Sequence, residues 1–247
     1  IENNDKVGVI LFSDKIEKFI PPKKGRKHIL LVISTLLDFK PENKGTDVNC
    51  ALEFLTSGIK KRCTSFLVSD FIDEGDYSKA LSIANNKHDL IAVQVYDKRE
   101  MQLPDVGLMR VYDAETGEER WINTSSKKVR ETYQRWWYQR QLKMSEKLQH
   151  SRVDLASIAT DEDYTKALLA LFKRRGVHAM MSPSSTTLLT ESFTSSPAIA
   201  TTFLGCTISS LMLVVSPITM WRLASSALEM SAFSFFAFIP NGMSKHA

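Results

Sequence analysis

Apolar residues in the first part of the chain occur in two patterns that follow each other along the sequence. Short uninterrupted runs, rich in β-branched residues, predict buried strands at residues 7–12, 64–68 and 90–96. The segments between them carry apolar residues every three or four positions, and predict helices at residues 28–39, 48–59 and 79–85. Because strands alternate with helices, the sequence predicts a mostly parallel sheet with helices on both faces, which is a three-layer α/β/α fold.

The next part of the chain predicts a smaller set of elements. Two short strands flank a Glu-Thr-Gly turn, a long helix follows, and an edge strand and a last helix complete the pattern. Their ranges are 106–112, 119–122, 126–149, 153–158 and 161–174. The last helix begins with Asp-Glu-Asp, which suits the positive end of a helix dipole.

Basic and aromatic residues share the long helix at 126–149. Its apolar stripe consists of Val129, Tyr133, Trp137, Met144 and Leu148. One interpretation is a basic-aromatic surface for an anionic partner such as RNA or lipid headgroups. The other, which we favour, is an amphipathic helix packed on the sheet with a solvated basic face. The formal net charge of +4 gives no further reason to expect a nucleic-acid partner.

Charged residues become rare after residue 176. Residues 177–247 carry charge only at Glu191, Arg222, Glu229 and Lys245. We therefore expect a domain over residues 1–176 and an apolar, Ser/Thr-rich tail that makes few contacts with it. The apolar stretches 192–221 and 223–239 allow three interpretations: a weak membrane hairpin, a disordered tail, or sequence from an altered reading frame or a fusion. Membrane contact is expected only if the tail is genuine.

The three cysteines, Cys50, Cys63 and Cys206, are odd in number and lack metal-ligand spacing. Neither a disulfide framework nor a zinc site is predicted. Cys50 and Cys63 lie on apolar faces, and buried thiols suit a reducing compartment. With no signal peptide at the start of the sequence, we expect a cytoplasmic location.

A hydroxyl and a carboxylate fall where two loops are expected to meet. Asp70 follows the strand at 64–68, and Thr46 precedes the helix at 48–59. Open α/β sheets bind ligands at the carboxyl ends of their strands, so both side chains can reach one rim. Mg²⁺ takes oxygen ligands, and Thr46 and Asp70 therefore predict part of a magnesium site. The plainer alternatives are that Asp70 caps a turn, and that Thr46 or Asp47 caps the helix.

Four motifs occur in order along residues 1–176. They are the segment Asp5–Ser13, Gly45-Thr46-Asp47 followed by Ala51-Leu52, Ser69-Asp70-Phe71, and the closing segment Asp161–Arg175. Together they resemble a von Willebrand factor A-type domain, and most closely the bacterial subfamily catalogued as domain of unknown function fifty-eight. The resemblance implies a doubly wound fold with a metal-ion-dependent adhesion site, in which Thr46 and Asp70 match the Thr and Asp of the second and third loops.

The first loop of that adhesion site, Asp-x-Ser-x-Ser, has no counterpart in this sequence. By the resemblance it should precede residue 1 together with its strand, so we expect an N-terminally truncated domain. One hydroxyl and one carboxylate leave most positions around Mg²⁺ to water. We therefore expect Mg²⁺ to bind this chain weakly or not at all.

The resemblance implies a protein-interaction module. Proteins of this kind are usually encoded beside MoxR-type AAA+ ATPases, which makes such an ATPase the expected partner. The sequence holds no nucleophile–base pair and no Gly-rich phosphate loop, so we expect no enzymatic activity. One alternative is a metal-dependent hydrolase that uses Asp70 with Asp14 or Asp38. The other is a nucleic-acid binder that uses the basic helix at 126–149.

Overall fold

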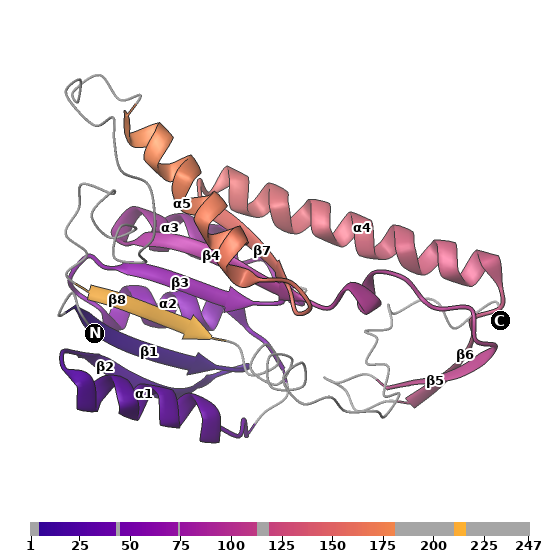
Figure 1. Ribbon diagram of the computed structural model, residues 1–247, viewed down its shortest axis with the longest axis horizontal. Coiled ribbons are helices and arrows are strands. Elements are labelled where there is room, and N and C mark those ends of the chain that lie inside the picture. The colour runs from indigo at the N-terminus through magenta and orange to yellow at the C-terminus, as the bar shows by residue number, and fades with distance from the viewer. Residues whose placement is uncertain (1–4, 43–44, 74, 113–118, 181–209, 216–247) are drawn as a thin grey trace.

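The computed structural model describes residues 5–42, 45–73, 75–112, 119–180 and 210–215 (Figure 1). Six strands form its main sheet, in the order β2-β1-β8-β3-β4-β7. They are β2 (Ile16–Lys23), β1 (Lys6–Phe12), β8 (Ser210–Val215), β3 (Thr64–Ser69), β4 (Asp89–Tyr96) and β7 (Asp154–Ala159). β2 pairs antiparallel with β1, and the other neighbours pair in parallel. The predicted strands at 7–12, 64–68 and 90–96 are therefore confirmed as parallel members of one sheet.

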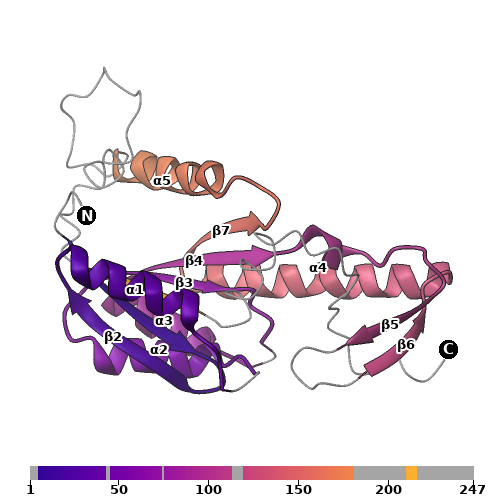
Figure 2. The ribbon, with the colours of Figure 1, turned by 60° about the horizontal axis from the view of Figure 1, so that its bottom comes forward.

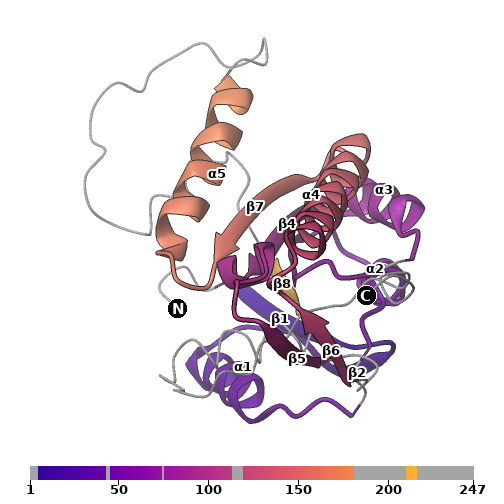
Figure 3. The same ribbon diagram turned by 90° about the vertical axis from the view of Figure 1, so that its right-hand side faces the viewer.

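Helices lie on both faces of this sheet, which confirms the three-layer α/β/α fold (Figures 2 and 3). One face carries α2 (Val48–Gly58), α3 (Ser78–Lys87) and α4 (Lys127–His150), and the other carries α1 (Arg26–Asp38) and α5 (Tyr164–Met180). Successive strand residues point to opposite faces. Ile10 and Phe12 accordingly join the cluster under α2, whereas Val9 and Leu11 join the cluster under α1.

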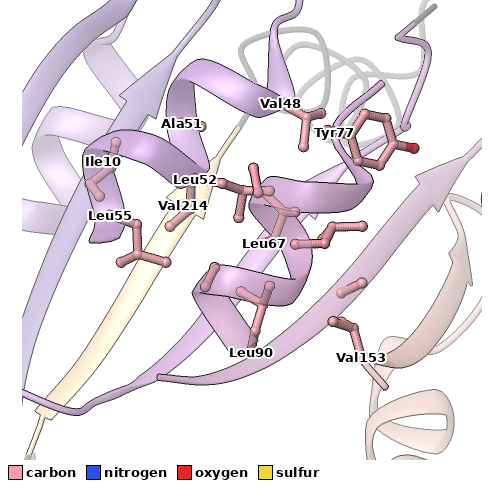
Figure 4. Close-up of a cluster of buried hydrophobic side chains, with 14 of the residues drawn as sticks. Ile10, Val48, Ala51, Leu52, Leu55, Leu67, Tyr77, Leu90, Val153 and Val214 are labelled. Atoms are coloured by element: carbon pink, nitrogen blue, oxygen red, sulfur yellow. The ribbon is translucent and has the colours of Figure 1, made fainter. Parts of the chain in front are cut away.

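The largest apolar cluster lies between the sheet and α2, α3 and α4 (Figure 4). Within α2, Leu52 and Leu55 are fully buried and recur at helical spacing with Val48 and Ala51. Burial of a leucine side chain contributes about 1.5–3 kcal/mol, so this face accounts for the docking of α2 on the sheet. The docking places the first turn of α2 at the carboxyl ends of the strands.

A hairpin and the long helix α4 extend from the main sheet (Figure 1). β5 (Leu108–Tyr112) and β6 (Glu119–Asn123) pair antiparallel, and the 3-10 helix η1 (Lys98–Met101) precedes them. Tyr133 of α4 packs with Leu103 and Val111, and its hydroxyl donates to the Glu100 carbonyl oxygen at 2.9 Å. This small cluster joins the hairpin to α4.

β2 is a strand that the sequence did not predict. It contains Pro21 and Pro22, which argue against a strand because proline lacks the backbone N–H that a ladder needs. β2 pairs on one side with β1 and lies at the edge of the sheet, where proline is tolerated. The register shift between Val7 and Val9 adjusts the pairing at this point.

The expectation that the tail makes few contacts with residues 1–176 is wrong for residues 210–215. They form β8, which pairs in parallel with both β1 and β3 in the middle of the sheet. The reason is physical: an apolar segment with β-branched residues fits a central strand, and Met212 and Val214 are fully buried. α5 also continues through Gly176 to Met180, so the change in composition does not coincide with the end of an element.

The other parts of the tail, residues 181–209 and 216–247, lie outside the described residues. The three interpretations of the tail therefore stay open for those parts. Among the helices of the described ranges, none is both long enough and apolar enough to cross a membrane.

Candidate functional site

Three loops meet at the carboxyl ends of β1 and β3. The Asp47 N–H donates to the Ser13 carbonyl oxygen at 2.8 Å, which holds the loop before α2 against the loop after β1. The Val48 N–H donates to Asp73 Oδ2 at 2.9 Å, which ties the start of α2 to the loop after β3. The loops that carry the predicted site residues therefore share one rim, where open α/β sheets bind ligands.

Thr46 contributes a hydroxyl to this rim that the helix cap does not use. Asp47 is the N-cap of α2, and its Oδ1 accepts from the Cys50 N–H at 3.0 Å. Thr46 Oγ1 is buried and has no hydrogen-bond partner among the described residues. Leaving a buried hydroxyl unsatisfied costs about 1–3 kcal/mol, so such a group usually has a ligand or an ordered water beside it.

Asp70 lies in a turn whose backbone is held on several sides. Its side chain is 4% exposed, and Oδ1 accepts from the Ile72 N–H at 3.0 Å, so the predicted turn-capping role is present. The next residue, Phe71, has a φ of 56°, a left-handed conformation that costs about 1–3 kcal/mol and is frequent at functional sites. The Phe71 N–H donates to Ser69 Oγ at 3.0 Å, and Arg140 Nη2 donates to the Phe71 carbonyl oxygen at 3.1 Å. β3 and α4 together fix the position of Asp70.

A second Ser-Asp pair reaches the same rim after β1. Ser13 is fully buried, and its Oγ donates to Asp14 Oδ1 at 3.0 Å. A Cβ atom added to Gly45 would lie 3.5 Å from the Asp14 Cβ, which shows how closely the two loops pack. Sequence reasoning considered Asp14 only for a hydrolase, and Ser13 only as part of a family motif and not as a site residue. The missed signal is that a Ser-Asp pair occurs at the carboxyl end of both β1 and β3.

The rim offers hydroxyl and carboxylate oxygens, which are ligands that suit Mg²⁺. Thr46 and Asp70 carry two such oxygens on loops of this rim, and Mg²⁺ binding by them stays a prediction. Within the described parts of the chain, no group of three or more His, Cys, Asp or Glu side chains could hold a metal ion. Asp38, the other partner considered for a hydrolase, is exposed as the last residue of α1. Weak Mg²⁺ binding stays a prediction.

α4 buries the stripe that the sequence predicted. Its buried side chains, all between 1% and 7% exposed, are Tyr133, Trp137, Met144 and Leu148. Some of its basic residues bind the protein itself, since Arg130 Nη1 pairs with Asp105 Oδ2 at 3.0 Å and Lys147 Nζ donates to the Gly75 carbonyl oxygen at 2.8 Å. The interpretation of this helix as amphipathic is confirmed, and its packing on the sheet is confirmed for Met144 and Leu148, whereas Tyr133 packs against the hairpin.

A buried polar cluster at the other end of β3 was not predicted. Cys63 Sγ lies 3.4 Å from His88 Nδ1 and 3.3 Å from Ser65 Oγ. Burial raises the pKa of the Cys63 thiol and lowers the pKa of the His88 imidazole. Both shifts favour the neutral forms, whereas a nucleophilic cysteine needs a lowered pKa. These directions do not indicate an activated thiol.

Comparisons with known proteins find one family model and several relatives without an assigned function. The family model "Protein of unknown function DUF58" matches residues 1–143. Uncharacterized proteins of Mycobacterium tuberculosis (Rv1480) and Mycobacterium bovis (Mb1516) are each 23% identical over 179 residues, which is 71% of this chain and 56% of theirs. An uncharacterized Mycobacterium avium protein (MAV169) is 22% identical over 158 residues, 63% of this chain and 93% of its own. The chain thus spans about half the length of the first two relatives.

Among solved structures, the conserved hypothetical protein BatB from Bacteroides thetaiotaomicron matches with a TM-score of 0.41 and 12% identity. The match covers 71% of this chain and 80% of that one, and a likeness this distant carries no functional argument. The family assignment rests on the family model, which covers more than half of the sequence. On that ground, the chain belongs to the DUF58 family of proteins of unknown function.

Proposed function

We propose that this domain is a von Willebrand factor A-like protein-interaction module and that it is not an enzyme. On this proposal, Thr46 and Asp70 help to hold a Mg²⁺ ion at the rim, and a carboxylate of the partner completes the coordination. The observation that carries the proposal is the buried Thr46 hydroxyl, which lacks a hydrogen-bond partner among the described residues. Its loop is tied to the loops after β1 and β3, which carry Asp14 and Asp70.

In this proposal the chain's own residues orient and restrict the site. Asp47 caps α2 and so leaves the Thr46 hydroxyl available. The turn at Phe71 keeps Asp70 buried against the end of β3. A bound Mg²⁺ would supply a positive charge that bridges to a partner's carboxylate.

The proposed partner is a MoxR-type AAA+ ATPase, and the support for it is the resemblance of the four motifs in residues 1–176. Mg²⁺ binding is tested first, because the proposed contact with the partner's carboxylate requires the bound ion.

Calorimetric titration with Mg²⁺ tests the site. We expect weak binding by this chain, lost on Asp70→Asn and on Thr46→Val, because each substitution removes one oxygen ligand while keeping the shape of the side chain. Asp76→Asn is the matched control, since Asp76 is an exposed carboxylate in the segment between β3 and α3. An added upstream segment with an Asp-x-Ser-x-Ser loop should raise the affinity strongly. Tight Mg²⁺ binding that survives Asp70→Asn would place the site elsewhere.

A further inference from the structure

α1 carries large apolar side chains on the side that points away from the sheet. Val32 is buried against the sheet, whereas Leu30, Ile33 and Leu37 are 55%, 46% and 79% exposed. These three recur at helical spacing and form a stripe along the outer side of the helix, where a surface helix normally carries polar side chains. Figures 1 and 2 show α1 at the edge of the molecule, beside β2. An exposed apolar stripe of this kind indicates a contact surface.

A cluster of basic residues lies at the start of the same helix. Its members, all exposed, are Lys23, Lys24, Arg26 and Lys27. None of the four forms an ion pair within the described parts of the chain. Arg26 precedes Leu30 by four positions, so it continues the apolar stripe on the same side of the helix. We call the basic cluster and the apolar stripe together the α1 surface.

The position of the basic cluster does not favour the helix by itself. Cations at the amino end of a helix lie at the positive end of its dipole, where anions are stabilising. Gly25 is the N-cap of α1 and has no side chain that could accept from the first-turn N–H groups. An anionic group at this end would compensate both features, because backbone N–H groups and cationic side chains both bind phosphate.

We propose that the α1 surface binds the surface of an anionic lipid bilayer, with α1 lying in the plane of the headgroups. Helices of this kind insert their apolar side chains between lipids and hold anionic headgroups with Lys and Arg. α1 has 13 residues and is about 20 Å long, which suits a helix that lies on a bilayer and is too short to span one. The inference does not depend on the proposed metal site.

Charge and area both argue against the other occupants of this surface. A nucleic acid would use the basic cluster but leave the apolar stripe in water. In an antiparallel pair of α1 helices from two copies, the four basic residues would meet Asp38, the one acidic residue of the helix. The outer side of a helix this long covers about 200 Å², whereas a stable dimer buries about 800 Å² per partner. A bilayer accepts the apolar and the basic part together.

Co-sedimentation of the full chain with lipid vesicles tests the proposal. We expect binding to vesicles of phosphatidylcholine and phosphatidylglycerol in equal parts, and little binding to phosphatidylcholine alone. Leu30→Gln with Leu37→Gln should weaken the binding by about tenfold or more, because two leucine side chains no longer insert. Leu142→Gln with Leu169→Gln is the matched control, since these leucines are 44% and 50% exposed on α4 and α5. Equal losses in the two pairs, or no binding to the anionic vesicles, would overturn the proposal.

The basic cluster is tested with a second pair of substitutions. Lys24→Gln with Lys27→Gln should weaken binding to the anionic vesicles by about tenfold, and added salt should weaken binding by the unchanged chain. Lys128→Gln with Lys143→Gln is the control, because both lysines are exposed on α4. If the control pair weakens binding as much, the attraction comes from the net charge of +4 and the proposal is wrong.

Photo-crosslinking identifies what covers the apolar stripe. A benzophenone amino acid at position 37 should crosslink to lipid in the anionic vesicles, and one at position 169 on α5 should not. A crosslink from position 37 to a second copy, or to another segment of the same chain, would contradict the proposal. This readout does not depend on how well the glutamine variants fold.

Discussion

His88 couples the stability of the fold to pH through a single side chain. It is fully buried, and burial followed by the charge of Lys87 lowers its pKa below the ordinary value of 6.5. The unfolded chain takes up a proton near pH 6.5, while the folded protein keeps this imidazole neutral to a lower pH. The contribution of His88 to the free energy of unfolding is therefore complete above pH 6.5. It is lost as the pH falls from 6.5 through the pKa of the folded state.

Urea unfolding at pH 7.5 and pH 5.5 measures this effect. We expect a smaller free energy of unfolding at pH 5.5, and His88→Gln should reduce the difference between the two values. His150→Gln is the control, because His150 is exposed at the end of α4. If His88→Gln leaves the difference unchanged while the protein stays folded, the pH dependence comes from other groups.

Sequence reasoning predicted which loops carry the candidate site residues, but it did not predict which buried side chains contact each other. The prediction that the loops carrying Thr46 and Asp70 reach one rim followed from the strand pattern alone, and the contacts through Asp47 and Val48 agree with it. The pair of Cys63 and His88 could not be predicted in this way. Their contact depends on how the start of β3 meets the end of α3, which packing decides and periodicity does not show.

The position of β8 in the middle of the sheet can be tested with one substitution. Met212 is fully buried between β1 and β3, so Met212→Ala should lower the free energy of unfolding by about 2–5 kcal/mol. Met101→Ala is the matched control: Met101 is 40% exposed at the end of η1, and its loss should cost less than about 0.5 kcal/mol. Chemical denaturation of both variants gives the comparison. A neutral Met212→Ala would mean that residues 210–215 do not occupy the middle of the sheet.

Sequence reasoning missed two strands, β2 and β8, for opposite reasons. β2 contains Pro21 and Pro22, and proline argues against a strand unless the strand lies at an edge, which only the sheet order reveals. β8 has a good strand pattern but lies in a segment whose overall composition suggested a separate tail. Composition describes a segment on average, whereas six consecutive residues are enough to fill a position in a sheet.

At the scale of the whole molecule, the long helix uses part of its basic charge for contacts within the protein. Arg130, Arg140 and Lys147 of α4 all bind groups of the protein, and Lys147 Nζ also lies 4.3 Å from the centre of the Tyr77 ring. We expect no measurable binding of single-stranded polyuridine at 150 mM salt by fluorescence anisotropy. Binding that persists at this salt and weakens steeply as more is added would instead indicate a phosphate-binding surface.

The layered architecture was predictable because it depends on a repeated pattern. Strands and helices alternate from α2 to β4 and again from α4 to α5, and short apolar runs between amphipathic helices leave few other folds. The order of the strands in the sheet could not be predicted from the sequence pattern. Nothing in the local pattern of β1 or β3 indicates that a segment from near the other end of the sequence separates them.

The central position of β8 has a consequence for the order in which the protein can be assembled. Lys6 pairs with Ser210, and Thr64 pairs with Leu211, so both neighbours of β8 are synthesised long before their shared partner. Until then each neighbour has an unpaired edge in what becomes the middle of the sheet, and such edges pair readily with other chains. Contacts of such long sequence separation also form slowly. The nascent chain therefore has a late, vulnerable step: its sheet is completed at the centre, after both flanks already exist.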